Sequence, residues 1–197
     1  MRLARSQKIT EQEYLEGEEI ARVKHEYVDG QVYAMAGATK THGELAVNLS
    51  TALRTHLRGK KCRTYVADMK VYLANSRAFY YPDVVVTCDP HDLGRTSPQN
   101  YLENPCLIVE VLSRKTARID RGEKRLTYCN LASLQEYVLV DQRRQSVEVF
   151  RRSSEGWVNE TLGPGDVLNL SAVDLQIPLT TLYEDTDVLG VALQAVD

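Results

Sequence analysis

The sequence predicts an α/β fold whose last third is an antiparallel meander. Two short apolar runs rich in β-branched residues, at 80–88 and 105–113, are typical of strands buried on both faces. Between residues 41 and 57, apolar residues recur with a helical period instead. From residue 146 onward, apolar and polar residues alternate between tight turns, which indicates antiparallel strands.

Length and composition favour a single domain. With 197 residues, of which 43% are hydrophobic, the chain suits one sizeable core and is short for two full domains. We expect one domain over 1–197, with an N-terminal helix and hairpin at 10–36, a core at 41–141 and C-terminal strands at 146–185. Because the N-terminus lacks an apolar signal region and no apolar window is long enough to span a membrane, we predict a cytoplasmic protein without a membrane partner.

The N-terminal segment predicts a short helix followed by a hairpin. Thr10 and Glu13 have the spacing of a capping box, and Gly17 weakens the helix that they begin. The Asp29-Gly30 pair between two β-type runs is a strong hairpin signal. Glu26 lies beside that turn, and the ordinary interpretation is that its side chain faces solvent at the edge of the sheet.

The next element is a helix that begins at Thr41 and ends at Gly59. Thr41 and Glu44 have the spacing of a second capping box, so we assign Glu44 a structural role. His42 lies in the first turn on the apolar face, where a packed, hydrogen-bonded histidine is favoured over a metal ligand. After this helix, residues 64–73 read as strand residues broken near Asp68.

The two apolar runs each contain a single acid, Asp83 in the first and Glu110 in the second. A carboxylate in a buried strand costs several kcal/mol unless it is paired, protonated or bound to a cation. If the strands are neighbours, the two acids could converge on one all-oxygen site suited to Mg²⁺ or Mn²⁺. The alternative is that both acids lie at strand ends and are paired locally.

A basic segment directly follows the strand that contains Glu110. Residues 114–125 hold six basic and two acidic side chains, although the formal net charge of the whole chain is −3. Any nucleic-acid binding must therefore come from such a local patch. If the segment is a helix, Asp120, Lys124 and Tyr128 lie on one face. This face could take part in a functional site, or it could be an ordinary solvated face with an ion pair between Asp120 and Lys124.

The remaining elements are a strand at 136–141 and the alternating strands of the meander. The four cysteines, Cys62, Cys88, Cys106 and Cys129, are widely spaced and include no C-x-x-C pair. We therefore expect reduced thiols.

These motifs, taken in order, resemble the Uma-two family of restriction-endonuclease-like proteins. The resemblance rests on Pro82-Asp83-Val84-Val85-Val86, on Glu110-Val111-Leu112-Ser113, on Asp120, Lys124 and Tyr128, and on the strand at 136–141, and it covers roughly residues 10–185. It implies the PD-(D/E)XK nuclease fold, with a restriction-endonuclease-like mixed central β-sheet flanked by helices. It also implies a divalent-metal site that cleaves phosphodiesters.

Carried over residue by residue, Asp83 is the aspartate of the Pro-Asp element and Glu110 is the acid of the E-x-K element. Leu112 stands where that element has its lysine, so we nominate Lys124 to supply the missing cation. Mg²⁺ or Mn²⁺ would bind to Asp83, Glu110 and a backbone carbonyl near Val111. Glu26, His42 and Asp120 are supporting candidates.

The expected function is therefore metal-dependent endonuclease activity on nucleic acid, with DNA the expected substrate. Cleavage of both strands by a one-site fold favours a homodimer. Two rival interpretations remain. One is a nuclease-fold module that binds nucleic acid or a protein without cleaving, which the missing lysine motivates. The other is a metal-dependent hydrolase of a small phosphoester.

Overall fold

A six-stranded sheet forms the centre of the computed structural model, which describes residues 8–35 and 37–188. Only β8 and β9 run parallel and every other pair is antiparallel, so the sheet is mixed, as predicted. In spatial order the strands are β11 (Gly156–Leu162), β10 (Val147–Ser153), β9 (Glu136–Asp141), β8 (Pro105–Leu112), β6 (Val84–Thr87) and β3 (Arg63–Val66).

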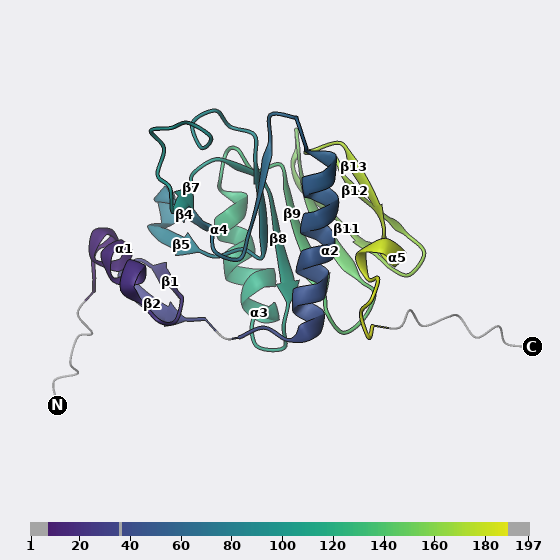
Figure 1. The fold of residues 1–197 in the computed structure, drawn as a ribbon, viewed down its shortest axis with the longest axis horizontal. Coiled ribbons are helices and arrows are strands. Elements are labelled where there is room, and N and C mark those ends of the chain that lie inside the picture. The colour runs from purple at the N-terminus through teal and green to yellow at the C-terminus, as the bar shows by residue number, and fades with distance from the viewer. Residues whose placement is uncertain (1–7, 36, 189–197) are drawn as a thin grey trace, which may run out of the picture.

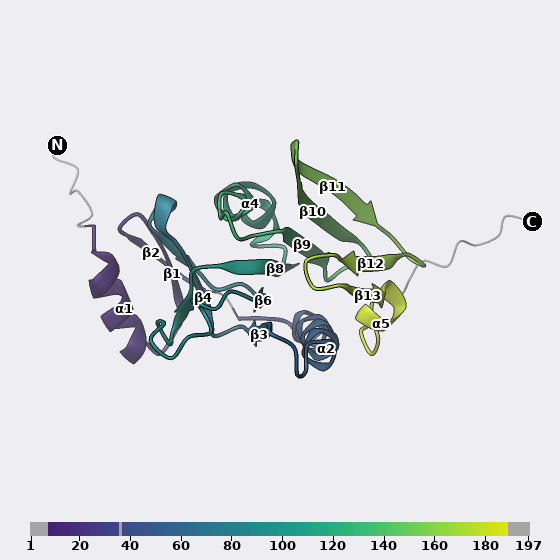
Figure 2. The same ribbon diagram turned by 90° about the horizontal axis from the view of Figure 1, so that it is seen from above.

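Helices cover both faces of this sheet (Figures 1 and 2). On one face lies α2 (Lys40–His56), which packs Leu45, Leu49 and Leu53 against Val109 and its neighbours. On the other lies a helical segment made of α3 (Ala117–Ile119), a π-helical turn (Asp120–Lys124) and α4 (Arg125–Cys129). Because side chains alternate along a strand, successive residues of β8 enter different cores.

The cap of α2 differs from the prediction. Thr39, not Thr41, is the N-cap, because its backbone is extended and its side-chain oxygen accepts a hydrogen bond from the His42 N–H at 3.2 Å. The predicted capping box of Thr41 and Glu44 is therefore wrong. The helix ends at His56, shortly before Gly59, whose φ of 77° is the left-handed conformation that glycine adopts easily.

A second sheet of five strands lies beside the first and includes the N-terminal hairpin. Its order is β2 (Gln31–Ala34), β1 (His25–Val28), β5 (Ala78–Tyr80), β4 (Lys70–Leu73) and β7 (Tyr101–Leu102). The predicted hairpin is confirmed, and Asp29 and Gly30 both have the positive φ that its two-residue turn requires.

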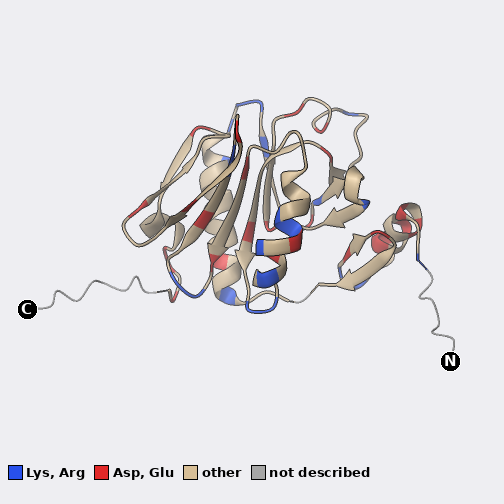
Figure 3. Ribbon diagram, turned by 180° about the vertical axis from the view of Figure 1, so that it is seen from behind, with Lys and Arg blue, Asp and Glu red and all other residues tan. Residues whose placement is uncertain are grey.

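The acidic helix α1 (Glu11–Ile20) precedes this hairpin at one end of the molecule, where Figure 3 shows its Glu residues in red. Thr10 and Glu13 form the predicted capping box. Gly17 lies inside the helix, which continues past this predicted weak point to Ile20. Tyr14 from this helix packs against Tyr27 and Phe79, and these aromatic contacts hold α1 on the sheet.

The predicted strand at 80–88 is divided between the two sheets. Tyr80 ends β5 in the five-stranded sheet, and Val84 begins β6 in the six-stranded sheet. Asp83 therefore stands just before its strand and not within it, because Pro82 cannot donate a ladder hydrogen bond. The strand residues at 64–73 are likewise divided, into β3 and β4, as the predicted break near Asp68 requires.

The C-terminal strands confirm the meander only in part. Strands β9, β10 and β11 follow one another as antiparallel neighbours. The hairpin of β12 (Val167–Leu170) and β13 (Leu175–Pro178), followed by α5 (Leu179–Leu182), forms a separate two-stranded sheet. The buried carboxylate of Glu136 accepts hydrogen bonds from Ser171 and Ala172 and so ties that hairpin to the central sheet.

One expectation about the cysteines is wrong, because Cys62 and Cys88 form a disulfide. The pairing follows from the sheet. Arg63 of β3 lies opposite Thr87 of β6, so the residues that flank this antiparallel pair also meet. Cys106 and Cys129 are free thiols. The cytoplasmic location stays a prediction.

Two further predictions concern the whole chain. Among the residues that the structure describes, no helix is long and apolar enough to cross a membrane. The assignment of 1–197 to one domain stays a prediction. Residues 1–7, Ala36, which ends the predicted N-terminal segment, and 189–197 lie outside the described residues.

Candidate active site

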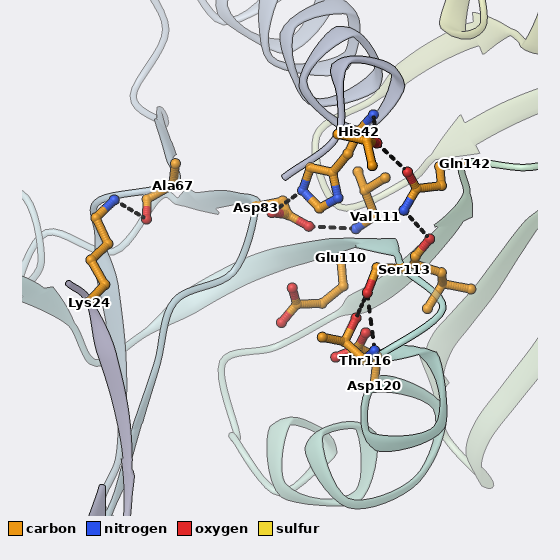
Figure 4. A network of polar contacts seen from close by, with 12 residues as sticks. Lys24, His42, Ala67, Asp83, Glu110, Val111, Ser113, Thr116, Asp120 and Gln142 are labelled. Atoms are coloured by element: carbon orange, nitrogen blue, oxygen red, sulfur yellow. Dashed lines mark hydrogen bonds and ion pairs between the residues drawn. The ribbon is translucent and has the colours of Figure 1, made fainter. Parts of the chain in front are cut away.

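Asp83 directly precedes β6 and Glu110 lies in β8, and these two strands are antiparallel neighbours. The register pairs Val84 of β6 with Val109 of β8, which places both acids at the same end of the sheet. The backbone N–H of Val111 donates to Asp83 Oδ2 at 2.6 Å, and His42 Nε2 lies 2.8 Å from Asp83 Oδ1 (Figure 4). The Asp83 carboxylate is therefore positioned from two sides and remains 20% exposed.

Glu110 lies on the opposite face of β8 from Val111, and Figure 4 shows it between Asp83 and Asp120. Leu112 lies two residues further along the same face of the strand and packs in an apolar core with Ile108. Only 4% of Glu110 is exposed. Its Oε1 accepts a hydrogen bond from the hydroxyl of Tyr128 at 3.2 Å and from Lys124 Nζ at 3.3 Å.

Lys124 places a buried cation beside Glu110. Its side chain is 7% exposed, and its Nζ lies 2.7 Å from Glu26, 3.3 Å from Glu110 and 3.7 Å from Asp120. The helix contributes this group through its π-helical turn, a feature that often marks functional sites. Glu26 thus faces the site and does not act as the solvent-facing edge residue that its place in the hairpin indicated.

The cluster is short of positive charge. Burial raises the pKa of Glu110 well above its ordinary value, and the nearby Lys124 only partly offsets this while Asp83 and Asp120 add to it. Burial also raises the pKa of Asp120, whose Oδ1 has no hydrogen-bond partner. Although Lys124 is buried as well, its neighbouring carboxylates outweigh the burial and keep the pKa of the ammonium raised.

His42 serves as a hydrogen-bonding partner of Asp83. Burial by itself would lower the pKa of the imidazole, but the hydrogen bond and the charge of Asp83 outweigh it and leave that pKa raised. The histidine is therefore half-buried and hydrogen-bonded, as the favoured interpretation of the sequence required. The sequence did not indicate that the hydrogen-bonding partner of His42 would be Asp83, a candidate metal ligand.

Replacement of Glu110 by Gln gives a pH-dependent prediction. Because its pKa is raised, the folded protein binds the Glu110 proton more tightly than the unfolded chain does. Glu110 therefore contributes stability below its ordinary pKa, and the contribution is lost as pH rises through the raised value. We expect Glu110→Gln to melt close to wild type near about pH 4 and increasingly above wild type towards about pH 8. Thermal unfolding in EDTA across this range measures the difference, and a gap that shrinks with pH would contradict it.

Comparison with known proteins identifies the family. A family model described as "Putative restriction endonuclease" (Uma2) matches residues 11–180. The chain belongs to the Uma2 family. Two uncharacterized proteins of Synechocystis sp. (strain ATCC 27184 / PCC 6803 / Kazusa) are similar to it. One, slr1290, is 39% identical over 177 residues, which are 89% of this chain and 92% of the relative. The other, sll1609, is 36% identical over 152 residues, 77% of this chain and 85% of the relative.

A solved structure shares the fold of this Uma2 chain. It is described as the crystal structure of "a putative nuclease belonging to DUF820" from Anabaena variabilis ATCC 29413, and it superposes with a TM-score of 0.74 at 16% identity. The match covers 89% of this chain and 97% of that one. The restriction-endonuclease-like α/β fold that the sequence predicted is thereby confirmed.

The donor set of this Uma2 site fits a hard divalent cation. Asp83 and Glu110 offer carboxylate oxygens, and Asp120 Oδ1 accepts no hydrogen bond although it lies 3.7 Å from Lys124 Nζ. Across residues 8–35 and 37–188, no three His, Cys, Asp or Glu side chains already stand together as a metal site. Mg²⁺ commonly binds to one or two carboxylates and completes its shell with water and substrate oxygens.

Two residues of the site were missed by sequence reasoning. The backbone N–H of Tyr81 donates to Glu26 at 3.3 Å and so positions the carboxylate that contacts Lys124. The side chain of Gln142, in the turn after β9, donates to the carbonyl of Leu112 at 2.9 Å. No local pattern marks either residue, because both act through contacts with segments far away in the sequence.

Proposed function

We propose that this Uma2 protein is a metal-dependent endonuclease that hydrolyses phosphodiester bonds of nucleic acid, with Asp83 and Glu110 as metal ligands and Lys124 as the catalytic cation. The observation that supports this most strongly is the approach of Lys124 Nζ to 3.3 Å from Glu110, from a helix packed on the strand. That contact supplies a cation beside the acid of the E-x-K element although Leu112 has replaced the lysine. The family match adds support from outside the structure.

The residues divide the chemistry between them. A bound Mg²⁺ or Mn²⁺ would supply an activated water and neutralise charge on the scissile phosphate. Lys124 orients the water or stabilises the negative charge that develops in the transition state. Glu26 and Asp120 flank its ammonium group and keep it protonated. His42 and the Val111 N–H fix the orientation of Asp83.

We infer DNA as the substrate and a homodimer as the active form. The description of the family, restriction endonuclease, is the reason for choosing DNA. A homodimer follows if both strands are cut, because the chain holds one carboxylate cluster of this kind among its described residues and each strand needs its own. Sedimentation with and without duplex DNA tests the second inference.

The experiment that tests the function is a cleavage assay with a matched metal titration. We expect supercoiled plasmid to be nicked or linearised by the wild type with Mg²⁺ or Mn²⁺ and not in EDTA. Glu110→Gln, which keeps the size of the side chain and removes its charge, is expected to lose saturable Mn²⁺ binding and about 100-fold or more of the cleavage rate. An equally active Glu110→Gln protein would refute the assigned site.

A binding module without catalysis is the second candidate, and one observation favours it. Lys124 is held by three carboxylates at once, so a structural ion-pair cluster would account for the same contacts. The titration separates the two candidates. If the folded wild type binds neither Mg²⁺ nor Mn²⁺ at millimolar concentration and cuts nothing, the cluster is structural.

A further inference from the structure

Three segments that carry exposed cations meet at the end of the central sheet where Asp83 and Glu110 lie. The first begins α2 and holds Lys40. The second follows β8 and holds Arg114, Lys115 and Arg118. The third is the turn after β9, which holds Arg143 and Arg144. All six side chains are exposed. We call these six residues the basic rim.

Gln142 joins the three segments by hydrogen bonds. Its Oε1 accepts from the hydroxyl of Thr39, which precedes Lys40, and its Nε2 donates to the carbonyl of Leu112, two residues before Arg114. Gln142 itself precedes Arg143. Figure 4 shows the Gln142 side chain between the start of α2 and the end of β8. One amide thus fixes the relative positions of cations from distant parts of the chain.

The loop after β8 has a defined shape of its own. The side-chain oxygen of Ser113 accepts hydrogen bonds from the backbone N–H groups of Lys115 at 3.2 Å and of Thr116 at 3.1 Å. This turn holds Arg114 and Lys115 on the surface directly after the strand of Glu110. Local hydrogen bonds of this kind reduce the entropy that the loop would lose on binding.

The charges of the basic rim are largely uncompensated. In the described ranges, Lys40, Arg114, Lys115 and Arg118 have no ion-pair partner, while Arg143 and Arg144 share the single carboxylate of Asp141. The first turn of α2 contains Lys40 and no acid, and a positive charge is unfavourable at the positive end of a helix dipole. A polyanion bound there would reduce the repulsion between the cations and would interact favourably with the positive end of the helix dipole.

We propose that the basic rim, assembled by Gln142, binds the sugar-phosphate backbone of duplex DNA and guides it to the carboxylate cluster. The inference rests on the proposed function, and it names the surface and the form of nucleic acid. Duplex is favoured over single strand because residues 39–42, 112–118 and 141–146 contain no Phe, Tyr or Trp on which unpaired bases could stack. Cationic side chains without neighbouring aromatic rings suit binding to a phosphate backbone.

The chain offers a matched control at the opposite end of α2. Arg58, Lys60 and Lys61 follow this helix, are exposed, and offer three cations, as many as a triple substitution in the basic rim removes. Figure 3 shows Lys and Arg in blue in the loop after α2, at the top of the view, and around α3 with the neighbouring turns, at the bottom. The seventeen residues of α2 separate the two clusters by about 25 Å, at about 1.5 Å per residue.

The test is fluorescence anisotropy with a labelled DNA duplex in EDTA, so that binding is measured without cleavage. We compare the Arg114→Ala/Lys115→Ala/Arg118→Ala variant, the control Arg58→Ala/Lys60→Ala/Lys61→Ala and wild type between about 50 and 200 mM salt. The rim variant is expected to bind about ten-fold or more weakly, with a salt slope lower by about 0.9 for each phosphate that is no longer neutralised. The control keeps the wild-type slope. Equally weakened binding in both variants would overturn the proposal.

Gln142→Ala tests the assembly of the surface, because it removes no charge. We expect several-fold weaker duplex binding with a melting temperature close to that of the wild type, and unchanged binding would overturn the role of Gln142.

Binding of a labelled single strand as tight as that of the duplex would overturn the choice of duplex. Hydrolysis of bis-p-nitrophenyl phosphate with Mn²⁺ reports the carboxylate cluster alone. A protein that hydrolyses this small diester but binds no duplex refutes the basic rim and leaves phosphodiester hydrolysis standing.

Discussion

Replacing Lys124 by Met is expected to destabilise the protein by about 3–5 kcal/mol, the usual cost of removing one partner from a buried ion pair. Met fills a similar volume and leaves the packing intact, so the loss isolates the charge. Without the ammonium group, Glu26, Glu110 and Asp120 face one another in a buried site and must take up protons or admit water. Chemical denaturation of wild type and variant at neutral pH measures the difference.

The controls for this prediction come from the loop before the helical segment of Lys124 and from the carboxylate cluster itself. Lys115→Met removes an exposed lysine close by in the sequence and is expected to change stability by no more than about 0.5 kcal/mol. The double variant Lys124→Met/Glu110→Gln should lose less stability than the two single changes added together, because it also removes one of the three carboxylates that Lys124→Met leaves without a cation. A Lys124→Met protein as stable as Lys115→Met would show that the cluster contributes nothing to folding.

The sequence indicated the two acids and the lysine of the candidate site because each stands out in its local pattern. Asp83 and Glu110 are single charges in apolar runs, and a charge there requires compensation. Lys124 shares a helix face with Asp120 and Tyr128, and all three side chains are buried at the site. The order of these motifs also indicated the family and therefore the mixed sheet.

What the sequence could not predict depends on contacts between distant segments. Glu26 looked solvent-facing because the hairpin pattern contains no sign of Lys124, which reaches it from a much later helix. Cys62 and Cys88 bond because β3 pairs with β6, and the register of that pair is not visible in their spacing. Thr39 and not Thr41 caps α2 because of the extended backbone at Thr39, and the local sequence pattern does not show this backbone direction.

Replacing Asp83 by Asn is expected to abolish metal-dependent cleavage, with a loss of about 1,000-fold or more. The substitution keeps the shape of the side chain, so the amide oxygen can accept from the Val111 N–H while the amide NH2 faces His42, where the charge-assisted hydrogen bond is lost. We therefore expect a folded protein that has lost about 1–3 kcal/mol of stability, the usual cost of one charge-assisted hydrogen bond. Plasmid cleavage and urea denaturation measure the two effects separately.

Asp68→Asn is the matched control, because Asp68 is an exposed carboxylate that pairs with Lys24 on the surface. It should cut at the wild-type rate and unfold within about 0.5 kcal/mol of wild type. The comparison with His42→Ala then separates the role of the carboxylate from that of its partner. If His42 only orients Asp83, His42→Ala keeps saturable Mn²⁺ binding and loses part of the rate, whereas Asp83→Asn loses both. A folded Asp83→Asn protein that still cuts DNA would remove Asp83 from the active site.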